Sequence, residues 1–345
     1  MIRSLEVNNF RCFKSASFPD LRRLNIVTGK NGSGKTALLE SLFVVGGGSA
    51  EIYIRTNIFR GRDFIGFTPD SVMPIFEDFF YNFDPTDGMR IVFKDSNGDE
   101  REVRIVVGSK ETINLPFDRK ASEATASRDL RFIWKSPKGQ TDSVVEVTKD
   151  GLRINQPTDV FPMVFLNQMT VGSPKDNADR WSVISAKNQE HPVEEAVRKL
   201  FPAVLGLSVL SSAGTPAVHV LVKGLDRKIP AGLLSAGVNK FISILVAISF
   251  AANGAVLIDE IENGLYYKTH RGMWEAIAEF AVANKTQIFA TTHSKEFLEA
   301  IAPIVESDEK NHSFLRLEKE NGQVKIESFA GKEYAGAVKS GFEVR

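Results

Sequence analysis

The last third of the chain alternates between apolar residues at helical spacing and short, continuously apolar runs. These patterns predict, in chain order, a helix at 238–252, a strand at 255–258, a helix at about 269–283, a strand at 286–291 and a helix at 294–302. Near the start of the chain, the run 24–27 reads as a similar strand, and the apolar helix after it ends at the glycines of 46–48. Such alternation indicates a parallel sheet with right-handed crossover connections.

Between residues 50 and about 225 the pattern changes to strand signals joined by turn residues, with an aromatic-rich segment at 64–83. Asn97-Gly98 and Asp150-Gly151 predict two hairpins, 90–95 with 101–107 and 143–148 with 151–155. The other predicted elements are strands at 2–8 and 15–18, an exposed loop at 109–128, a strand at 161–166, a polar loop at 172–180, a helix at 192–200, strands at 204–210 and 217–223, and a final hairpin of 313–318 with 323–328 before a short tail.

Composition and charge narrow the class of protein. The 345 residues are 43% hydrophobic and 25% charged, as is typical of a soluble globular chain. The 43 basic and 43 acidic residues cancel, so the overall charge does not indicate nucleic-acid binding, although a local basic patch stays possible. The single cysteine, Cys12, excludes an intrachain disulfide, and the charged N-terminus is not typical of a signal peptide; we therefore expect a cytoplasmic location. The uncharged run Phe241–Ile258 approaches the length of a membrane span, but the Asn253-Gly254 turn divides it into a buried helix and a buried strand, and no membrane association is expected.

Residues 29–36, GKNGSGKT, have the form G-x-x-x-x-G-K-[ST] of a P-loop. The glycines allow successive backbone N–H groups to point into one concavity, where they hold nucleotide phosphates, and the following helix adds its partial positive charge. Lys35 is expected to reach the β- and γ-phosphates, and the Thr36 hydroxyl to ligate Mg²⁺. The expected nucleotide-binding residues of the loop are Gly29, Asn31, Gly32, Ser33, Gly34, Lys35 and Thr36. The sequence therefore predicts a site for ATP and Mg²⁺.

The predicted strand 255–258 ends in two acids. In P-loop enzymes an acid at this place holds Mg²⁺, which makes Asp259 the expected metal ligand beside Thr36. Glu260, one residue further, is expected to polarise the attacking water as general base. Two solvated acids at a strand end are the alternative interpretation, which a P-loop in the same chain disfavours.

Three further motifs carry a family resemblance. Leu234-Ser235-Ala236-Gly237 resembles the L-S-G-G signature of ABC-class ATPases, Ile261–Leu265 stands at the D-loop position, and His293 looks like the switch histidine. With Asn9-Phe10-Arg11 and the P-loop spacing, the chain is similar to the RecF, SMC and overcoming-lysogenization-defect heads. It resembles most the small, stand-alone bacterial AAA/ABC-type ATPases with the pattern I-D-E-I-E-N-G-L. The motifs cover about 1–48 and 228–300.

The resemblance implies an α/β fold, that of a P-loop NTPase of the ABC-ATPase type. We expect a mixed or parallel sheet core with an antiparallel β lobe and an inserted α+β lobe. The whole chain, 1–345, would form a single head. Its expected parts are a core from about 1–48 and 228–312, an inserted lobe at about 50–225, and a C-terminal hairpin and tail at 313–345.

The resemblance also implies a homodimer held together by ATP, with a larger assembly possible. In this class ATP lies between two heads, so Ser235 and Gly237 of one copy would complete the γ-phosphate shell of the other. His293 would hydrogen-bond the γ-phosphate, as a catalytic residue beside Glu260. The sequence departs from the class pattern at Ala236, where a glycine is expected, and no glutamine follows Gly237. The glutamine loop is not identifiable, and Gln168 and the weaker Gln156 are its candidates.

Three functions are compatible with these motifs. The leading one is an ATP-hydrolysing, ATP-dimerised switch, by family analogy the sensor ATPase of a bacterial defence or toxin system. Its nuclease-like effector would be a separate protein, because the 52 residues after His293 contain no cluster of acids suited to two metals. The alternative is a RecF-like DNA-repair ATPase that binds duplex DNA itself, which would require a basic surface. Arginines cluster at positions 22 and 23 and at 55, 60 and 62, although such runs are more often solvated faces. A small-molecule P-loop kinase is the third, and it leaves the signature-like loop unexplained.

Overall fold

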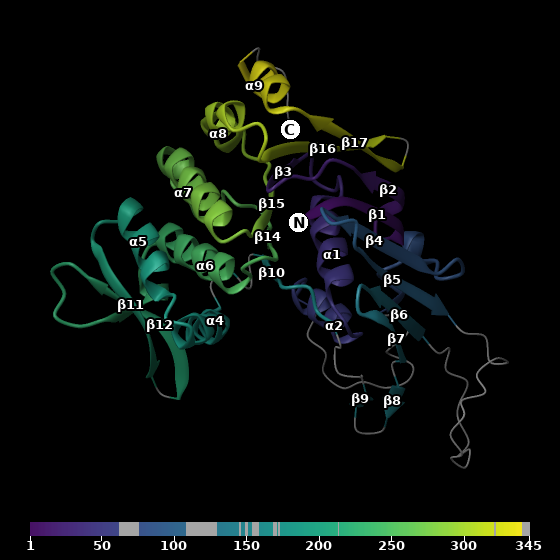
Figure 1. Cartoon of the computed structure of the whole chain (residues 1–345), viewed down its shortest axis with the longest axis horizontal. Helices are drawn as coiled ribbons and strands as arrows, with labels where there is room; N and C mark the ends of the chain where they lie inside the picture. Colours follow the sequence, from purple (N-terminus) through teal and green to yellow (C-terminus); the bar gives the residue numbers. More distant parts are fainter. Residues whose placement is uncertain are drawn as a thin grey trace.

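A six-stranded sheet passes through the middle of the protein (Figure 1). The computed structural model describes residues 1–61, 76–107, 130–144, 146–148, 151–153, 159–167, 171, 173–212, 214–320 and 322–339. In spatial order the core sheet consists of β10 (Met163–Leu166), β14 (Ala255–Ile258), β15 (Gln287–Thr291), β3 (Leu24–Thr28), β16 (His312–Glu320) and β17 (Gln323–Phe329). The first five strands are parallel, and β17 pairs with β16 in the antiparallel sense.

Helices cover both faces of this sheet, which is why the strands β10 and β14 are continuously apolar. The helices α6 (Ala236–Phe250), α7 (His270–Ala283) and α8 (Lys295–Ser307) pack on one face with Ile26 and Ile258, and α1 (Lys35–Gly46) packs on the other face with Leu257 and Phe289 (Figure 1). Almost every residue of α1 is buried, because it lies between the core sheet and a second, antiparallel sheet. The α/β core with parallel strands is the one that the sequence predicts.

The second sheet is entirely antiparallel. Its spatial order is β2 (Phe13–Phe18), β1 (Ile2–Phe10), β4 (Met89–Asp95), β5 (Glu100–Val107), β6 (Leu130–Ser136) and β7 (Gly139–Val144). Tyr53 of α2 (Glu51–Ile58) contacts the rings of Phe76, Phe79 and Phe132 beneath this sheet. Phe76, Phe79 and Phe80 of the aromatic-rich segment are therefore core residues, whereas Phe83 is exposed.

A smaller lobe packs against α6 at the other end of the molecule (Figure 1). It consists of α4 (Pro174–Ala186), α5 (Glu190–Leu200), β11 (Val204–Ser212), β12 (Thr215–Val222) and β13 (Ile229–Pro230). The remaining elements are η1 (Tyr81–Phe83), β8 (Glu146–Thr148), β9 (Gly151–Arg153), η2 (Ala231–Leu233), η3 (Tyr267–Thr269) and α9 (Gly331–Lys339). The core sheet takes β10 from within the stretch 50–225, and the division into a head core and an inserted lobe stays a prediction.

Several predicted elements need correction. The polar loop at 172–180 is wrong, because α4 begins at Pro174 with the Ser173 hydroxyl accepting a hydrogen bond from the Asp176 N–H at 3.3 Å. Neither α2 nor α9 was predicted; α9 lies where the sequence indicated only a tail. The hairpin of 143–148 with 151–155 is confirmed only for β8 and β9, since residues 143 and 144 end β7. The predicted loop at 109–128 lies outside the described residues.

The uncharged run Phe241–Ile258 is divided as the sequence predicts, because α6 ends at Phe250 and β14 begins at Ala255. None of the helices in the described part of the chain has the length and apolar character needed to cross a bilayer.

Candidate nucleotide-binding site

The P-loop connects the carboxyl end of β3 to α1, and its backbone geometry requires glycine. Gly29, Gly32 and Gly34 have φ values of 143°, 78° and 104°, which are strained for any residue with a side chain. A Cβ atom at Gly29 would also lie 2.2 Å from the Leu317 carbonyl oxygen. The Lys35 ammonium donates to the carbonyl oxygens of Gly29 at 2.6 Å and Lys30 at 3.1 Å. The loop is therefore already wrapped around the amino group that the sequence assigns to phosphate binding.

A cleft of about 1210 Å³ opens beside this loop. Its walls come from the P-loop and α1, the β1–β2 turn, the segment 78–83, the ends of β10 and β14, and the β16–β17 hairpin. Burial in this wall lowers the pKa of Lys35, while the nearby carboxylates of Asp259 and Glu260 act in the opposite direction. The cleft thus combines a phosphate-binding loop with the acids Asp259 and Glu260.

Thr36 and Asp259 meet where β14 ends. The Thr36 hydroxyl lies 3.0 Å from Asp259 Oδ2, and the Thr291 hydroxyl donates to Asp259 Oδ1 at 2.6 Å. Burial raises the pKa of Asp259, against the effect of these two hydrogen bonds. A hydroxyl and a carboxylate are hard oxygen ligands that fit Mg²⁺, which takes one or two carboxylates together with substrate phosphates. Within the described residues no group of three or more His, Cys, Asp or Glu forms an all-protein metal site.

Glu260 is held by its backbone and by its side chain. Its φ of 49° is left-handed, and its N–H donates to the Thr291 hydroxyl at 2.8 Å. The Asn263 amide donates to Glu260 Oε2, and the Lys240 ammonium donates to the carbonyl oxygens of Glu260 at 2.7 Å and Asn263 at 3.0 Å. Burial lowers the pKa of Lys240 to about 8. Sequence reasoning found Glu260 but missed the contacts that Lys240, 20 residues earlier, and Asn263, three residues later, make with it.

His293 is paired with an acid that the sequence analysis did not assign. Its Nδ1 lies 3.0 Å from Glu262 Oε1, and the same oxygen accepts the His293 backbone N–H at 3.0 Å. The Glu262 side chain is only 7% exposed, whereas that of His293 is 48% exposed. The second glutamate of the I-D-E-I-E pattern was the available signal for this contact.

The signature segment lies apart from the P-loop cleft. Ser235 caps α6, accepting the Val238 N–H at 3.4 Å, and Gly237 approaches the D-loop so closely that a Cβ atom there would lie 3.2 Å from the Gly264 carbonyl oxygen. Among the described residues that line the cleft, none is Ser235, Gly237 or His293. Gln168 and Gln156 lie outside the described residues; Asn167 does line the cleft and donates to the Phe59 carbonyl oxygen at 2.7 Å.

A buried acid joins two arginines at the cleft wall. Glu40 of α1 is 1% exposed and accepts from Arg60 Nε at 2.5 Å and from Arg11 Nε at 3.2 Å. The Arg11 Nη1 group also donates to the Asp78 carbonyl oxygen at 2.9 Å. This network explains part of the Asn9-Phe10-Arg11 motif, because Arg11 fastens the β1–β2 turn to α1 and to the segment after Phe76.

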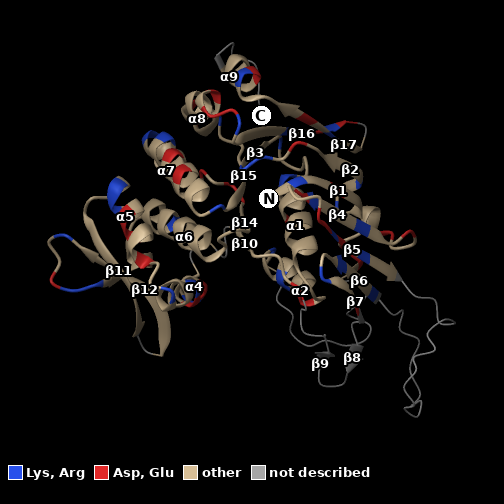
Figure 2. Ribbon diagram, viewed as in Figure 1, with Lys and Arg blue, Asp and Glu red and all other residues tan. Residues whose placement is uncertain are grey.

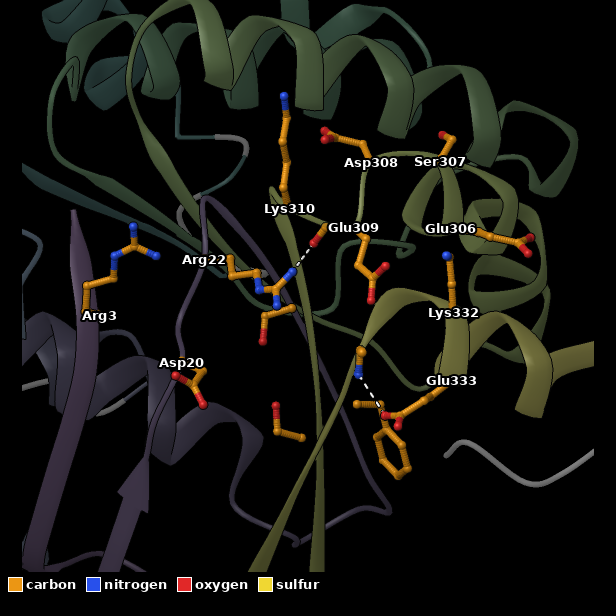
Figure 3. Close-up of a pocket in the computed structure, with 14 residues that line it drawn as sticks. Arg3, Asp20, Arg22, Glu306, Ser307, Asp308, Glu309, Lys310, Lys332 and Glu333 are labelled. Carbon is orange, nitrogen blue, oxygen red and sulfur yellow. Dashed lines mark hydrogen bonds between the residues drawn. The ribbon is translucent and has the colours of Figure 1, made fainter.

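A second cleft, of about 1170 Å³, lies at the opposite ends of the core strands (Figure 3). It is lined by residues that precede β3 and β16 and that follow β17, among them Arg22 and Lys310. The Arg22 guanidinium donates to the Glu309 carbonyl oxygen. Basic and acidic side chains alternate around this cleft, so its charge does not indicate an anionic ligand, and the P-loop cleft remains the candidate site.

Comparison with known proteins also indicates a nucleotide-binding protein. A protein-family model described as "AAA domain, putative AbiEii toxin, Type IV TA system" matches residues 24–299. A Helicobacter pylori protein named "ATP/GTP phosphatase" is 25% identical over 348 aligned residues, which cover 90% of each chain. A protein from Idiomarina loihiensis named "DNA replication and repair protein RecF" is 43% identical over 47 residues, 14% of this chain and 13% of that one.

The fold is also shared with a solved structure, "Crystal structure of the SmcHead bound to the C-winged helix domain of ScpA". The TM-score is 0.53 at 15% identity, and the match covers 95% of this chain and 98% of that one. The similarities confirm the predicted resemblance to ABC-class ATPases of the RecF and SMC type, and the predicted fold class.

Proposed function

Because the chain belongs to the family described as "AAA domain, putative AbiEii toxin, Type IV TA system", we propose that it is an ATP-dimerised switch of a bacterial defence or toxin system. The chain is an ABC-type ATPase with relatives of the RecF and SMC type, and it hydrolyses ATP. In the proposed cycle, ATP clamps two copies together and hydrolysis releases them. A separate, nuclease-like effector protein responds to this change between dimer and monomer.

The observation that carries the proposed dimer is the separation of the two half-sites. Lys35, Thr36 and Asp259 line one cleft, whereas Ser235 lies on another surface with its hydroxyl exposed at the N-terminus of α6. A helix N-terminus with an exposed serine suits a phosphate, but within one chain it is not part of the described cleft wall. A second copy can bring this surface to the cleft, and by symmetry receives the same surface in return.

The residues of the composite site have distinct tasks. The backbone N–H groups of 32–36 and the Lys35 ammonium bind the phosphates, and Ser235 and Gly237 of the second copy close the site around the γ-phosphate. Bound Mg²⁺, held by Thr36 and Asp259, would supply positive charge against the phosphate oxygens. Glu260 accepts a proton from the attacking water, and His293 donates a hydrogen bond to the γ-phosphate.

Mixing two inactive variants tests the composite site. Lys35→Ala removes the P-loop charge. Ser235→Arg blocks the signature surface, which is formed by Leu234–Gly237 at the start of α6, so each homodimer should lack ATPase activity. A mixed dimer contains one intact composite site, and an equimolar mixture should recover about a quarter of the wild-type rate, since half the dimers are mixed and each has one of two sites. Absence of recovery from two folded variants that demonstrably co-dimerise would remove the shared-site proposal.

The defence role rests on the family description and is tested through the effector. We expect a partner protein to co-purify with the tagged full chain in the presence of ATP and to be lost with Lys35→Ala. A chain that captures no protein with nuclease activity in cells that carry its neighbouring genes would contradict a separate effector.

A RecF-like role in DNA repair is the second candidate, favoured by the 47-residue similarity to RecF. The arginines that the sequence offered for DNA contact are partly engaged within the protein: Arg60 with Glu40, Arg22 with the Glu309 carbonyl oxygen, and Arg23 with the Lys285 carbonyl oxygen at 2.6 Å. Arg62 lies outside the described residues. Basic and acidic residues are interspersed over the described elements in Figure 2. Tight DNA binding by the isolated protein that weakens steeply with salt would favour this second function.

A further inference from the structure

Phe83 lines the P-loop cleft, where its aromatic ring is exposed and its backbone is strained. Its side chain lines the cleft and is 67% exposed. Asn82 and Phe83 have φ values of 52° and 61°, and two consecutive left-handed residues without glycine are uncommon, most of all for a bulky ring. Such strain persists where the surrounding structure imposes it, and it is often found at ligand sites.

The surrounding structure does impose it, because the β1–β2 turn anchors this segment on both sides. The Arg11 N–H donates to the Phe79 carbonyl oxygen at 2.7 Å, and the Arg11 guanidinium lies 4.1 Å from the centre of the Phe79 ring. The Asn9 amide donates to the carbonyl oxygens of Asp84 at 3.0 Å and Gly88 at 2.6 Å. Asn9 and Arg11, part of the motif that the sequence analysis singled out, thus fix the segment that carries Phe83.

The orientation of a nucleotide in the cleft follows from the acids. The P-loop binds phosphates, and Asp259 and Glu260 define the γ-phosphate end, so the nucleoside extends toward the walls away from these acids. Besides the P-loop, α1 and the acids, the walls of the cleft are the residues after α2, the end of β10, the segment 78–83 with the β1–β2 turn, and the β16–β17 hairpin with Lys319.

Among the described residues of the cleft, Phe83 presents the most open aromatic ring. Phe80 and Phe165 are buried, and Phe59 packs its ring against Phe165 at 5.5 Å between ring centres. Tyr81, next to Phe80, is partly exposed. The segment 80–83 is therefore the wall that offers an aromatic face to the nucleoside.

We propose that the nucleobase binds at Phe83, with Tyr81 beside it, and that the Phe83 ring stacks on the face of the base. The proposal rests on nucleotide binding at the P-loop and not on the dimer. Stacking uses the π-face that every base has and does not read the base edge. The site therefore selects a triphosphate with an aromatic base and accepts adenine and guanine alike.

The test compares three ligands with Mg²⁺ present: ATP, GTP and inorganic tripolyphosphate, each titrated into the full chain by calorimetry. Wild-type protein should bind ATP and GTP with dissociation constants within about threefold of each other. Phe83→Ala should weaken both about tenfold, in the range of one base–aromatic stack, and should change tripolyphosphate binding by less than about twofold. Phe83→Trp should restore the affinity for both nucleotides.

Phe250→Ala is the matched control, because Phe250 is 41% exposed at the end of α6 and does not line the cleft. Unchanged ATP affinity in Phe83→Ala would overturn the proposal, as would an equal loss for tripolyphosphate. A loss of base-dependent affinity in Lys319→Ala, with none in Phe83→Ala, would place the base at the hairpin and overturn it too. If wild-type protein binds neither ATP nor tripolyphosphate, the P-loop assignment itself fails, and that result is distinct from a failure of the stacking proposal.

Discussion

The P-loop cleft and the signature surface differ in how far each is organised within one chain. In the cleft, Lys35, Thr36 and Asp259 already hydrogen-bond to loop carbonyls or to one another. On the signature surface, Ser235 makes one long N-cap hydrogen bond, and Leu233 beside it is 72% exposed. Two tyrosines that directly follow the D-loop, Tyr266 and Tyr267, are more than half exposed.

This difference indicates that the signature surface, and not the P-loop cleft, needs a partner to become organised. Preorganised donors bind a phosphate without the cost of ordering them first, so the cleft can capture ATP alone. Exposed apolar side chains around a helix N-terminus gain by being covered, which a second copy carrying ATP would do. We therefore expect substitutions in the cleft to change nucleotide binding and substitutions near the signature and D-loop to change turnover.

The largest expected effect is that of Lys35→Ala. The variant removes the side-chain ammonium that donates to the P-loop carbonyl oxygens, and with it the charge expected to face the β- and γ-phosphates. ATP affinity should fall by about a hundredfold or more, the scale of losing a charge-assisted contact to a polyanion. Calorimetry with MgATP measures this directly, and Lys14→Ala, at an exposed lysine of β2, is the control. Unchanged affinity in Lys35→Ala would contradict the assignment of the cleft.

Glu260→Gln separates binding from turnover. The amide keeps the shape of the side chain and can still accept from Asn263, but it cannot take a proton from water. We expect the ATP affinity to stay within about threefold and kcat to fall by about a hundredfold or more, as for loss of a general base. An ATP-bound dimer should then accumulate and be visible by light scattering after gel filtration. Turnover at the wild-type rate would refute Glu260 as the base.

Residues that act through backbone geometry were visible in the sequence, and those that act through tertiary contact were not. The P-loop, the strand before Asp259 and the helix at 294–302 were predictable, because each depends on near neighbours in the chain. The Ser294 hydroxyl starts that helix by accepting the Phe297 N–H at 3.1 Å. The core with parallel strands followed from the alternation of helices and strands.

The contacts around the acids could not be predicted in the same way. Lys240 reads in the sequence as one polar residue in an apolar helix, and only the packing of α6 on the D-loop brings its ammonium to the Glu260 carbonyl oxygen. Glu40 likewise looks like a surface acid of α1, although it is buried between Arg11 and Arg60. The helix at 174–186 was missed because its first turn is polar and resembles a loop.

A smaller effect is expected for Glu262, which lies between the two regions. Glu262→Ala removes the acceptor of both the Nδ1 and the backbone N–H of His293, so the imidazole loses its fixed orientation. We expect kcat to fall about tenfold with KM changed less than about twofold, the pattern of an interaction made mainly in the transition state. Glu262→Gln keeps an oxygen acceptor and should recover much of the rate. Equal losses in the two variants, or none in Glu262→Ala, would argue against a positioning role.

The smallest expected effect tests the link between the signature helix and the D-loop through its pH dependence. Lys240 has a pKa of about 8 in the folded chain, against an ordinary value of 10.5, chiefly because it is buried. Between these values the unfolded chain binds one more proton at this position than the folded chain, so Lys240 makes the free energy of unfolding rise with pH. Relative to Lys240→Met, wild-type protein should gain on the order of 1 kcal/mol between pH 8 and pH 9.5, measured by urea unfolding. Lys14→Met, at an exposed site, should show no such difference.

Parallel stability curves for wild type and Lys240→Met would mean that the Lys240 ammonium is not buried against the D-loop. The signature surface would then be less tightly coupled to Glu260 than the hydrogen bonds of Lys240 indicate.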